Sequence, residues 1–199
     1  MINFELILPE LFLSLSIMFS LMIGVFKKKS SKLIQNISLV ILLITAVIIF
    51  NETLGINEVK LFNNSIIIDY FSSLMKILTI LSAFLVLAIS SNYLKIFKIF
   101  KIEYPILILS SVLGMMVMIS SNDLIVFYMG LELQSLALYV LATFNRDQLK
   151  SSEAGLKYFV LSALSSGLLL YGCSLIYGFT GSTNFNIIAS QLNSDQYAL

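Results

Sequence analysis

The residue best suited to chemistry in this sequence is a glutamate in the middle of an apolar run. The run covers residues 123–144 and reads DLIVFYMGLELQSLALYVLATF, with Glu132 near its centre. At about 1.5 Å per residue, Glu132 lies roughly 14 Å from Asp123, close to half-way through a hydrocarbon layer of about 30 Å. A carboxylate at that depth costs on the order of 3 kcal/mol on insertion scales, and such residues commonly mark ion or proton pathways.

Three other polar side chains share a helix face with Glu132. Tyr128, Ser135 and Tyr139 lie around it at spacings of three and four residues, which places all four on one side of a helix. That face would turn a carboxylate, a hydroxyl and two phenols toward a neighbouring helix or a file of water. The alternative is that Glu132 is structural and is hydrogen-bonded to another span to hold a bundle together.

Further charges occur in two other apolar runs. Glu153 and Lys157 are four residues apart with the acid first, the favourable order for a helical ion pair. Lys157 lies about one turn inside its run, so it either takes part in proton transfer or extends to the headgroups, and the spacing favours neither. Lys157 and Glu132 would differ in depth by roughly 12 Å in upright helices, so we expect no direct contact. For Lys76, two turns inside an earlier run, we expect extension to the membrane surface.

The composition indicates a protein that crosses a membrane several times. Of the 199 residues 58% are hydrophobic, the net charge is +1, histidine is absent and Cys173 is the single cysteine. Soluble domains contain only about 45–50% apolar residues. The charge suggests no nucleic-acid partner, and one cysteine allows neither a disulfide framework nor a Cys-based metal site. We expect no cofactor and no metal in this chain. Proton chemistry would fall to Lys, Glu, Asp, Tyr and water.

Six apolar runs predict an all-α polytopic membrane protein. They cover residues 6–26, 33–50, 70–90, 105–120, 123–144 and 153–178. Between the second and third runs, VKLFNNSIII predicts a small β-hairpin, and YLKIFKIFKI after the third predicts an amphipathic helix on the membrane surface. Ser151 or Ser152 is expected to cap the last span. The tail, residues 179–199, is mostly polar, and its last residues are expected to belong to an unfinished loop.

Basic residues are unequally divided among the connections. The connections after spans 1, 3 and 5 hold four, three and two Lys or Arg residues, whereas those after spans 2 and 4 and the tail hold one, none and none. Short cytoplasmic loops carry an excess of Lys and Arg. We therefore expect the N-terminus on the periplasmic side, or on the intermembrane-space side in a mitochondrion.

The last three spans resemble a known family. The segments LELQSLALYVLATF and SSEAGLKYFVLSALSSGLLLYGCSLIYGFTGSTNF are similar to the subunit 2 family of the proton-pumping NADH:ubiquinone oxidoreductase (respiratory complex I). The similarity covers about residues 114–185 and is close to mitochondrial and α-proteobacterial forms. The first three spans resemble the family in layout, and DYFSSLMK resembles its entry to the third span.

The resemblance implies the first part of an antiporter-like helical bundle, built in the family from inverted five-helix repeats. Residues 1–103 would form an N-terminal three-span bundle, and residues 104–199 the first half of the repeat with a polar tail. Glu132 matches the family's mid-membrane glutamate, which modulates a lysine on a seventh span, and Lys157 matches the lysine of its EAxLKYF motif. We therefore predict a proton path through these two residues, with supporting roles for Tyr128, Ser135, Tyr139 and Glu153.

The resemblance also implies a role in a larger enzyme. This would be a membrane-arm subunit contributing to proton translocation coupled to electron transfer from NADH to ubiquinone, in the mitochondrial inner membrane or a bacterial cytoplasmic membrane. Flavin, iron–sulfur clusters and quinone would belong to other subunits, so no redox centre is expected here. Expected partners are other membrane-arm subunits, membrane lipid and a second chain supplying the seventh span onward, because the family has about fourteen spans.

Other readings fit the same residues. Three accounts fit the missing spans: a split gene whose other product completes the subunit, a truncated chain, or a genuinely short protein. The first two are favoured. The chain could be half of a separate cation/proton antiporter subunit, since the fold is shared. It could also be a non-conducting assembly scaffold of the membrane arm, in which Glu132 and Lys157 would tolerate neutral replacement.

Overall fold

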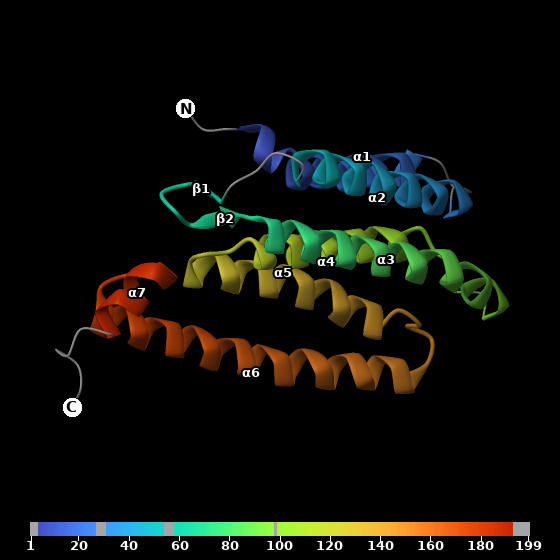
Figure 1. Cartoon of the computed structure of the whole chain (residues 1–199). Coiled ribbons are helices and arrows are strands. Elements are labelled where there is room, and N and C mark those ends of the chain that lie inside the picture. Colours follow the sequence, from blue (N-terminus) through green and yellow to red (C-terminus); the bar gives the residue numbers. More distant parts are fainter. Residues whose placement is uncertain (1–3, 27–30, 54–57, 98, 193–199) are drawn as a thin grey trace.

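The computed structural model describes residues 4–53, 58–97 and 99–192, except 27–30, and shows an elongated bundle of helices (Figure 1). The helices are α1 (Leu8–Phe26, after a 3-10 turn at Phe4–Ile7), α2 (Ser31–Thr53), α3 (Tyr70–Ile96), α4 (Glu103–Ile119), α5 (Leu124–Ala142), α6 (Leu149–Thr180) and α7 (Phe185–Leu192). Strands β1 (Val59–Leu61) and β2 (Ile66–Ile68) form an antiparallel hairpin, as predicted.

The predicted spans are present as helices, and the fold is all-α apart from the hairpin. Five helices, α1, α2, α3, α5 and α6, are long and apolar enough to cross a membrane, and α4 is a shorter apolar helix of 17 residues. Pro9 lies in the first turn of α1, where its missing N–H leaves no hydrogen bond unmade. Gly181 ends α6 with φ 64, a left-handed conformation that glycine adopts without strain.

Helices α1 to α4 form one packed unit. Both α1 and α3 pack against α2 and α4, and their buried apolar side chains make a single cluster that includes Leu13, Leu42, Leu87 and Leu109. Helix α5 lies along α4, and α6 lies along α5 at the edge of the bundle (Figure 1). The core of the predicted three-span bundle therefore continues into α4, and the division at residue 103 stays a prediction.

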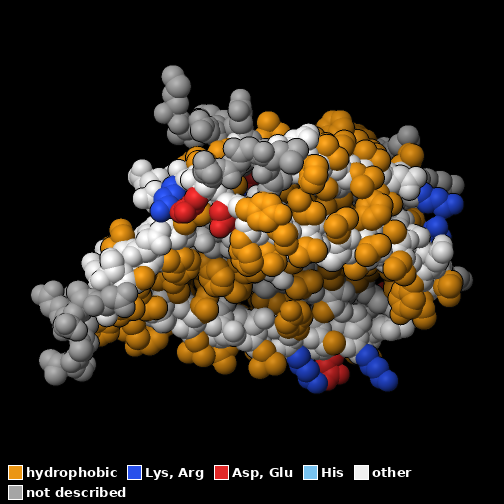
Figure 2. Space-filling model, viewed as in Figure 1, with side chains coloured by type: hydrophobic (Ala, Val, Ile, Leu, Met, Phe, Trp, Pro, Cys, Tyr) orange, Lys and Arg blue, Asp and Glu red, His pale blue; other side chains and the backbone are white. Residues whose placement is uncertain are grey.

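Apolar side chains cover most of the outer surface. Large hydrophobic residues such as Leu15, Phe19, Ile89 and Leu164 are more than half exposed, and they spread over the helices in Figure 2. A soluble monomer rarely exposes such large contiguous apolar surface. Lipid is the solvent that suits this surface.

Two glycines set the close approach of α4 and α5. A Cβ at Gly114 would lie 2.6 Å from the backbone nitrogen of Gln134 and 2.8 Å from the carbonyl oxygen of Gly130. A Cβ at Gly130 would lie 2.8 Å from the backbone nitrogen of Met118. The two backbones therefore touch, in the way that small residues permit in membrane helix pairs. This contact fixes α5, and with it Glu132, against the packed unit.

Polar side chains close the end of the bundle that carries the hairpin. The main-chain oxygen of Asn64 in the hairpin accepts hydrogen bonds from Asn122 Nδ2 (2.8 Å) and Asn184 Nδ2 (2.9 Å). Asp123 caps α5, and its second carboxylate oxygen accepts a hydrogen bond of 2.5 Å from Thr183 Oγ1. The hairpin, the α4–α5 turn and the α6–α7 turn are thus joined. Figure 1 shows the α5–α6 connection at the opposite end.

Some local predictions were wrong. The segment YLKIFKIFKI forms no separate surface helix, because α3 continues through it to Ile96; Lys98 lies outside the described residues. In the tail, α7 occupies Phe185–Leu192, a helix that the sequence did not predict; the last residues, 193–199, lie outside the described residues. Neither Ser151 nor Ser152 caps α6, since the helix begins at Leu149 after Gln148. Ser151 Oγ instead donates to the carbonyl oxygen of Ala142 at the end of α5.

Candidate functional site

Glu132 lies two and a half turns inside α5, and one of its carboxylate oxygens is enclosed by protein. The Oε1 atom is buried and accepts no hydrogen bond from any residue that the structure describes. An unsatisfied carboxylate oxygen is costly in an apolar interior, so such an atom calls for a donor. The side chain as a whole is only half-buried, which leaves room for that donor to be water or another side chain.

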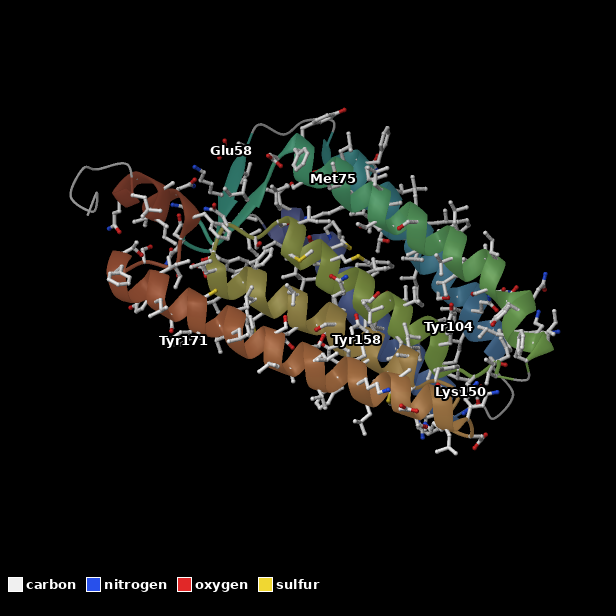
Figure 3. All side chains as sticks on the ribbon, turned by 90° about the horizontal axis from the view of Figure 1, so that it is seen from below. Glu58, Met75, Tyr104, Lys150, Tyr158 and Tyr171 are labelled. Carbon is white, nitrogen blue, oxygen red and sulfur yellow. The ribbon has the colours of Figure 1, made fainter. Side chains whose placement is uncertain are left out.

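The predicted polar face of α5 turns toward α6. The ring of Tyr139 is buried and makes edge-on contacts with Tyr158 at 5.0 Å and Phe159 at 5.7 Å between centroids. Tyr158 is seen beside α5 in Figure 3. Glu132 lies seven residues before Tyr139, two helical turns away on the same side. Glu132 therefore lies on the side of α5 that faces α6.

The other members of this face are half-buried. Ser135 Oγ donates to the main-chain oxygen of Glu132 at 3.0 Å, so in this state its hydroxyl is bound to the helix and not to the carboxylate. Tyr128 lies one turn before Glu132 and is half-buried. The structure thus brings Tyr128, Glu132, Ser135 and Tyr139 to one side of α5. A role for them in proton transfer remains a prediction.

Lys157 and Glu153 form the predicted ion pair, but on the outside of the bundle. Lys157 Nζ and Glu153 Oε1 are 2.6 Å apart, and the side chains are 68% and 63% exposed. Gly155, midway between them, is the buried residue that faces Thr143 of α5, so the charged side chains point away from α5. Lys157 and Glu132 are not paired with each other in this structure.

The structure contains a buried ion pair that sequence reasoning missed. Lys76 of α3 is 3% exposed, and its Nζ lies 2.5 Å from Oε1 of Glu10, in the first turn of α1. The expectation that Lys76 extends to the membrane surface was therefore wrong, because a carboxylate inside the bundle satisfies its charge. Oε2 of Glu10 is buried and has no hydrogen-bond partner in the described part of the chain.

Within residues 4–192, leaving out the undescribed gaps, no group of three or more His, Cys, Asp or Glu side chains is placed to hold a metal ion. Cys173 is unpaired and half-buried. It lines an apolar cavity of about 450 Å³ with Leu124, Ile125 and Leu170. The arrangement offers the carboxylate of Glu132, with one oxygen unbonded among the described residues, and the ion pairs of Lys76 and Lys157 in an apolar surround. Carboxylates and amines in such surroundings can take up, hold and release protons.

Comparison with known proteins decides the family. The chain is 69% identical over 197 residues to NADH-quinone oxidoreductase subunit N of Pelagibacter ubique, covering 99% of the chain and 42% of that protein. It is 48% identical over 184 residues to subunit N of Paramagnetospirillum magneticum, covering 92% and 38%. The chain belongs to the family of NADH-quinone oxidoreductase subunit N. It spans about two fifths of the length of these relatives.

The family comparison and the solved structures agree with the fold. Residues 121–198 match the family described as NADH:quinone oxidoreductase/Mrp antiporter, TM. A chain of respiratory complex I from Thermus thermophilus with bound aureothin aligns with a TM-score of 0.75 at 24% identity, covering 88% of this chain and 38% of that one. A chain of the membrane-bound sulfane sulfur reductase, an archaeal respiratory membrane complex, aligns with a TM-score of 0.79 at 23% identity, covering 94% and 40%. This chain thus shares its helical membrane fold with part of each of these two chains.

Proposed function

We propose that this chain contributes to proton translocation in the membrane arm of a NADH-quinone oxidoreductase. The observation that carries the proposal is the 69% identity to a subunit N over nearly the whole chain. The structure adds Glu132, a carboxylate well inside a membrane-spanning helix with a buried, unpartnered oxygen. Such residues are retained in membranes chiefly where ions or protons pass.

The mechanism acts through charge. Electron transfer in other subunits would change the electrostatic field at Glu132, and a charge within a few ångströms acts strongly where the dielectric constant is low. A cation brought near Glu132 stabilises the carboxylate and favours proton release, and its withdrawal favours proton uptake. Redox cofactors and quinone would belong to partner subunits, with no redox centre in this chain.

We also infer the placement of the chain in the cell. The relatives named above are bacterial, which favours the bacterial cytoplasmic membrane over the mitochondrial inner membrane. The more basic connections gather at the end opposite the hairpin, where Lys101, Arg146 and Lys150 are exposed; Figure 3 shows Lys150 at that end and Glu58 at the other. By the positive-inside rule, the hairpin end and the N-terminus face the periplasm.

The partners follow from the same family. Other membrane-arm subunits and lipid would cover the apolar outer surface. The outer side of α6, to which Lys157 and Tyr171 belong, would face either lipid or further helices of a subunit N. Lys157 would then exchange its present partner, Glu153, for groups on those helices.

The direct test replaces Glu132 with glutamine in the assembled complex. NADH oxidation and the resulting proton gradient are measured in inverted membrane vesicles. We expect Glu132→Gln to lower the protons moved per NADH several-fold while the amount of assembled complex changes little. Glu103→Gln, an exposed glutamate in the first turn of α4, is the matched control and should pump normally. Undiminished pumping by assembled Glu132→Gln enzyme would refute the proposal.

A separate cation/proton antiporter is the second candidate, because the matching family description includes the Mrp antiporter. It predicts purification without iron–sulfur subunits and Na⁺-dependent proton movement in vesicles without NADH. A scaffold without conduction predicts that both Glu132→Gln and Lys157→Gln leave pumping unchanged.

A further inference from the structure

Helix α6 turns one narrow stripe of small side chains toward α5. Between residues 156 and 179 every side chain is exposed except Ser162, Ser166, Gly172 and Cys173. Gly155, which is buried against Thr143 of α5, lies on the same stripe, seven residues before Ser162 and eleven before Ser166. Spacings of about two and three whole turns keep residues on one face of a helix. Ser162 and Ser166 therefore face α5.

The register between the two helices places Ser166 at the level of Glu132. Tyr139 of α5 contacts Phe159 of α6, and the helices run in opposite directions. Glu132 lies two turns back along α5 from Tyr139, and Ser166 lies two turns forward along α6 from Phe159. Ile125 and Cys173 then line one cavity a further two turns along, as the same register requires.

In the part of the chain that the structure describes, Glu132 Oε1 lacks a hydrogen-bond donor, and the hydroxyl of Ser166 is able to supply one. Glu132 Oε1 is buried and has no donor among the described residues. Ser166 is half-buried, and its Oγ donates at 3.2 Å to the carbonyl oxygen of Ala163 in its own helix. That oxygen lies inside a helix, where a main-chain N–H is its usual donor, so it does not depend on the bond from Ser166. Rotation about one side-chain bond redirects a serine hydroxyl. A hydroxyl bonded to a carboxylate forms a shorter and stronger bond than one bonded to a neutral carbonyl.

We propose that Ser166 is a positioning residue for Glu132, donating its hydroxyl hydrogen to the carboxylate when that group is charged and returning to the Ala163 carbonyl when Glu132 takes up a proton. The hydroxyl thereby favours one orientation of the carboxylate, toward α6, in its charged form. This inference rests on the proposed function of Glu132, because it assigns the hydroxyl a part in the proton cycle.

The first experiment tests the contact without reference to pumping. Infrared spectra of the purified complex identify the carboxylate band of Glu132 as the band that Glu132→Gln removes. Ser166→Ala is expected to shift that band, and Ser165→Ala, the exposed neighbouring serine, is expected to leave it in place. An unshifted band in Ser166→Ala would overturn the inference whatever the pumping activity. If Ser166→Ala does not assemble, Ser166→Cys keeps the volume but is a weak donor and is expected to give the same shift.

The second experiment measures NADH-driven pumping in vesicles. Ser166→Ala should lower pumping several-fold and by no more than Glu132→Gln does, because the hydroxyl acts only through Glu132, and a hydrogen bond to a charged group is strong enough for an effect of that size. Ser166→Thr, which keeps the hydroxyl, should pump near the normal rate. In the Glu132→Gln background, Ser166→Ala should have no additional effect. Equal losses in both backgrounds would show a packing role only and would refute the proposal, whereas failure of the proposed function itself would appear as normal pumping by Glu132→Gln alone.

Discussion

The buried ion pair between α1 and α3 gives the sharpest prediction about stability. Lys76→Met would leave Glu10 without its cation, and Glu10→Leu would leave Lys76 without its anion. The double variant would replace both charges with apolar side chains of similar size. Because α1 and α3 each pack mainly on α2 and α4, this pair directly joins two helices that otherwise make few contacts with each other.

The burial of the pair sets the size of the effect. The side chains of Lys76 and Glu10 are only 4% and 14% exposed, so water cannot solvate a charge left behind. Removing one partner of a buried pair costs about 3–5 kcal/mol, whereas replacing both with apolar residues is often neutral or stabilising. Oε2 of Glu10 already has no donor among the described residues, so we expect about 3 kcal/mol for either single variant and about 0 for the double variant.

Thermal unfolding in one detergent at pH 7, followed by circular dichroism, measures the difference. At about 2–4 °C per kcal/mol for a chain of this size, either single variant should unfold about 6–12 °C earlier, and the double variant should recover most of that loss. Lys60→Met is the matched control, since Lys60 pairs with Glu58 at 3.2 Å on the exposed hairpin, with side chains 42% and 56% exposed. Exposed pairs contribute about 0–1 kcal/mol.

The order of melting temperatures among the variants tests whether the pair stabilises the chain through its charges. If the double variant unfolded as early as the single variants, the loss would come from packing volume and not from an unpaired charge. If the single variants unfolded at the same temperature as the parent protein, the charge left behind would have to be solvated by water, although Lys76 is only 3% exposed. Either result would refute the account of the pair as a buried electrostatic link.

Two further predictions concern the helix contact and the orientation. Gly114→Ala should destabilise the chain by about 1–3 kcal/mol, because its Cβ would force α4 and α5 apart. Gly167→Ala is the control: a Cβ there meets nothing within 4 Å, so this variant should be neutral or stabilised by up to about 1 kcal/mol. Equal melting temperatures for the two variants would contradict the close contact. A cysteine introduced in place of Asn63 in the hairpin should react with a membrane-impermeant thiol reagent in intact cells; protection in cells and reaction only in inverted vesicles would reverse the proposed orientation.

Hydrophobic length and turn chemistry made most of the fold predictable. The apolar runs gave the position of each spanning helix, because a bilayer requires long uninterrupted helices. Asn63 and Asn64 signalled the hairpin because asparagine tolerates left-handed backbone, and both have positive φ, at 54° and 67°. Helix ends were less certain. Helix α3 runs on to Ile96 because its polar last turns still make helical hydrogen bonds beyond the apolar stretch.

The candidate site was only partly predictable. Spacing along one helix gave the polar face around Glu132, which is local information. The Glu10–Lys76 pair joins residues 66 positions apart, and no local pattern links them. A usable signal did exist, since Glu10 lies near the start of one span and Lys76 two turns into another that begins at the same end. Opposite charges at similar depth in different spans are candidates for pairing.

The length of α6 has a consequence for how the chain meets the membrane. Its 32 residues extend about 48 Å at 1.5 Å per residue, against a hydrocarbon layer of about 30 Å. A tilt of about 40°, the upper end of what membrane helices show, would still leave the helix too long for that layer. With its C-terminal end held level with the hairpin by the Thr183–Asp123 contact, the excess must emerge at the other end. The first turns of α6 therefore extend beyond the lipid at the end opposite the hairpin, where they present the charged side chains of Lys150 and Glu153 to water. In the orientation proposed above, that end is the cytoplasmic one.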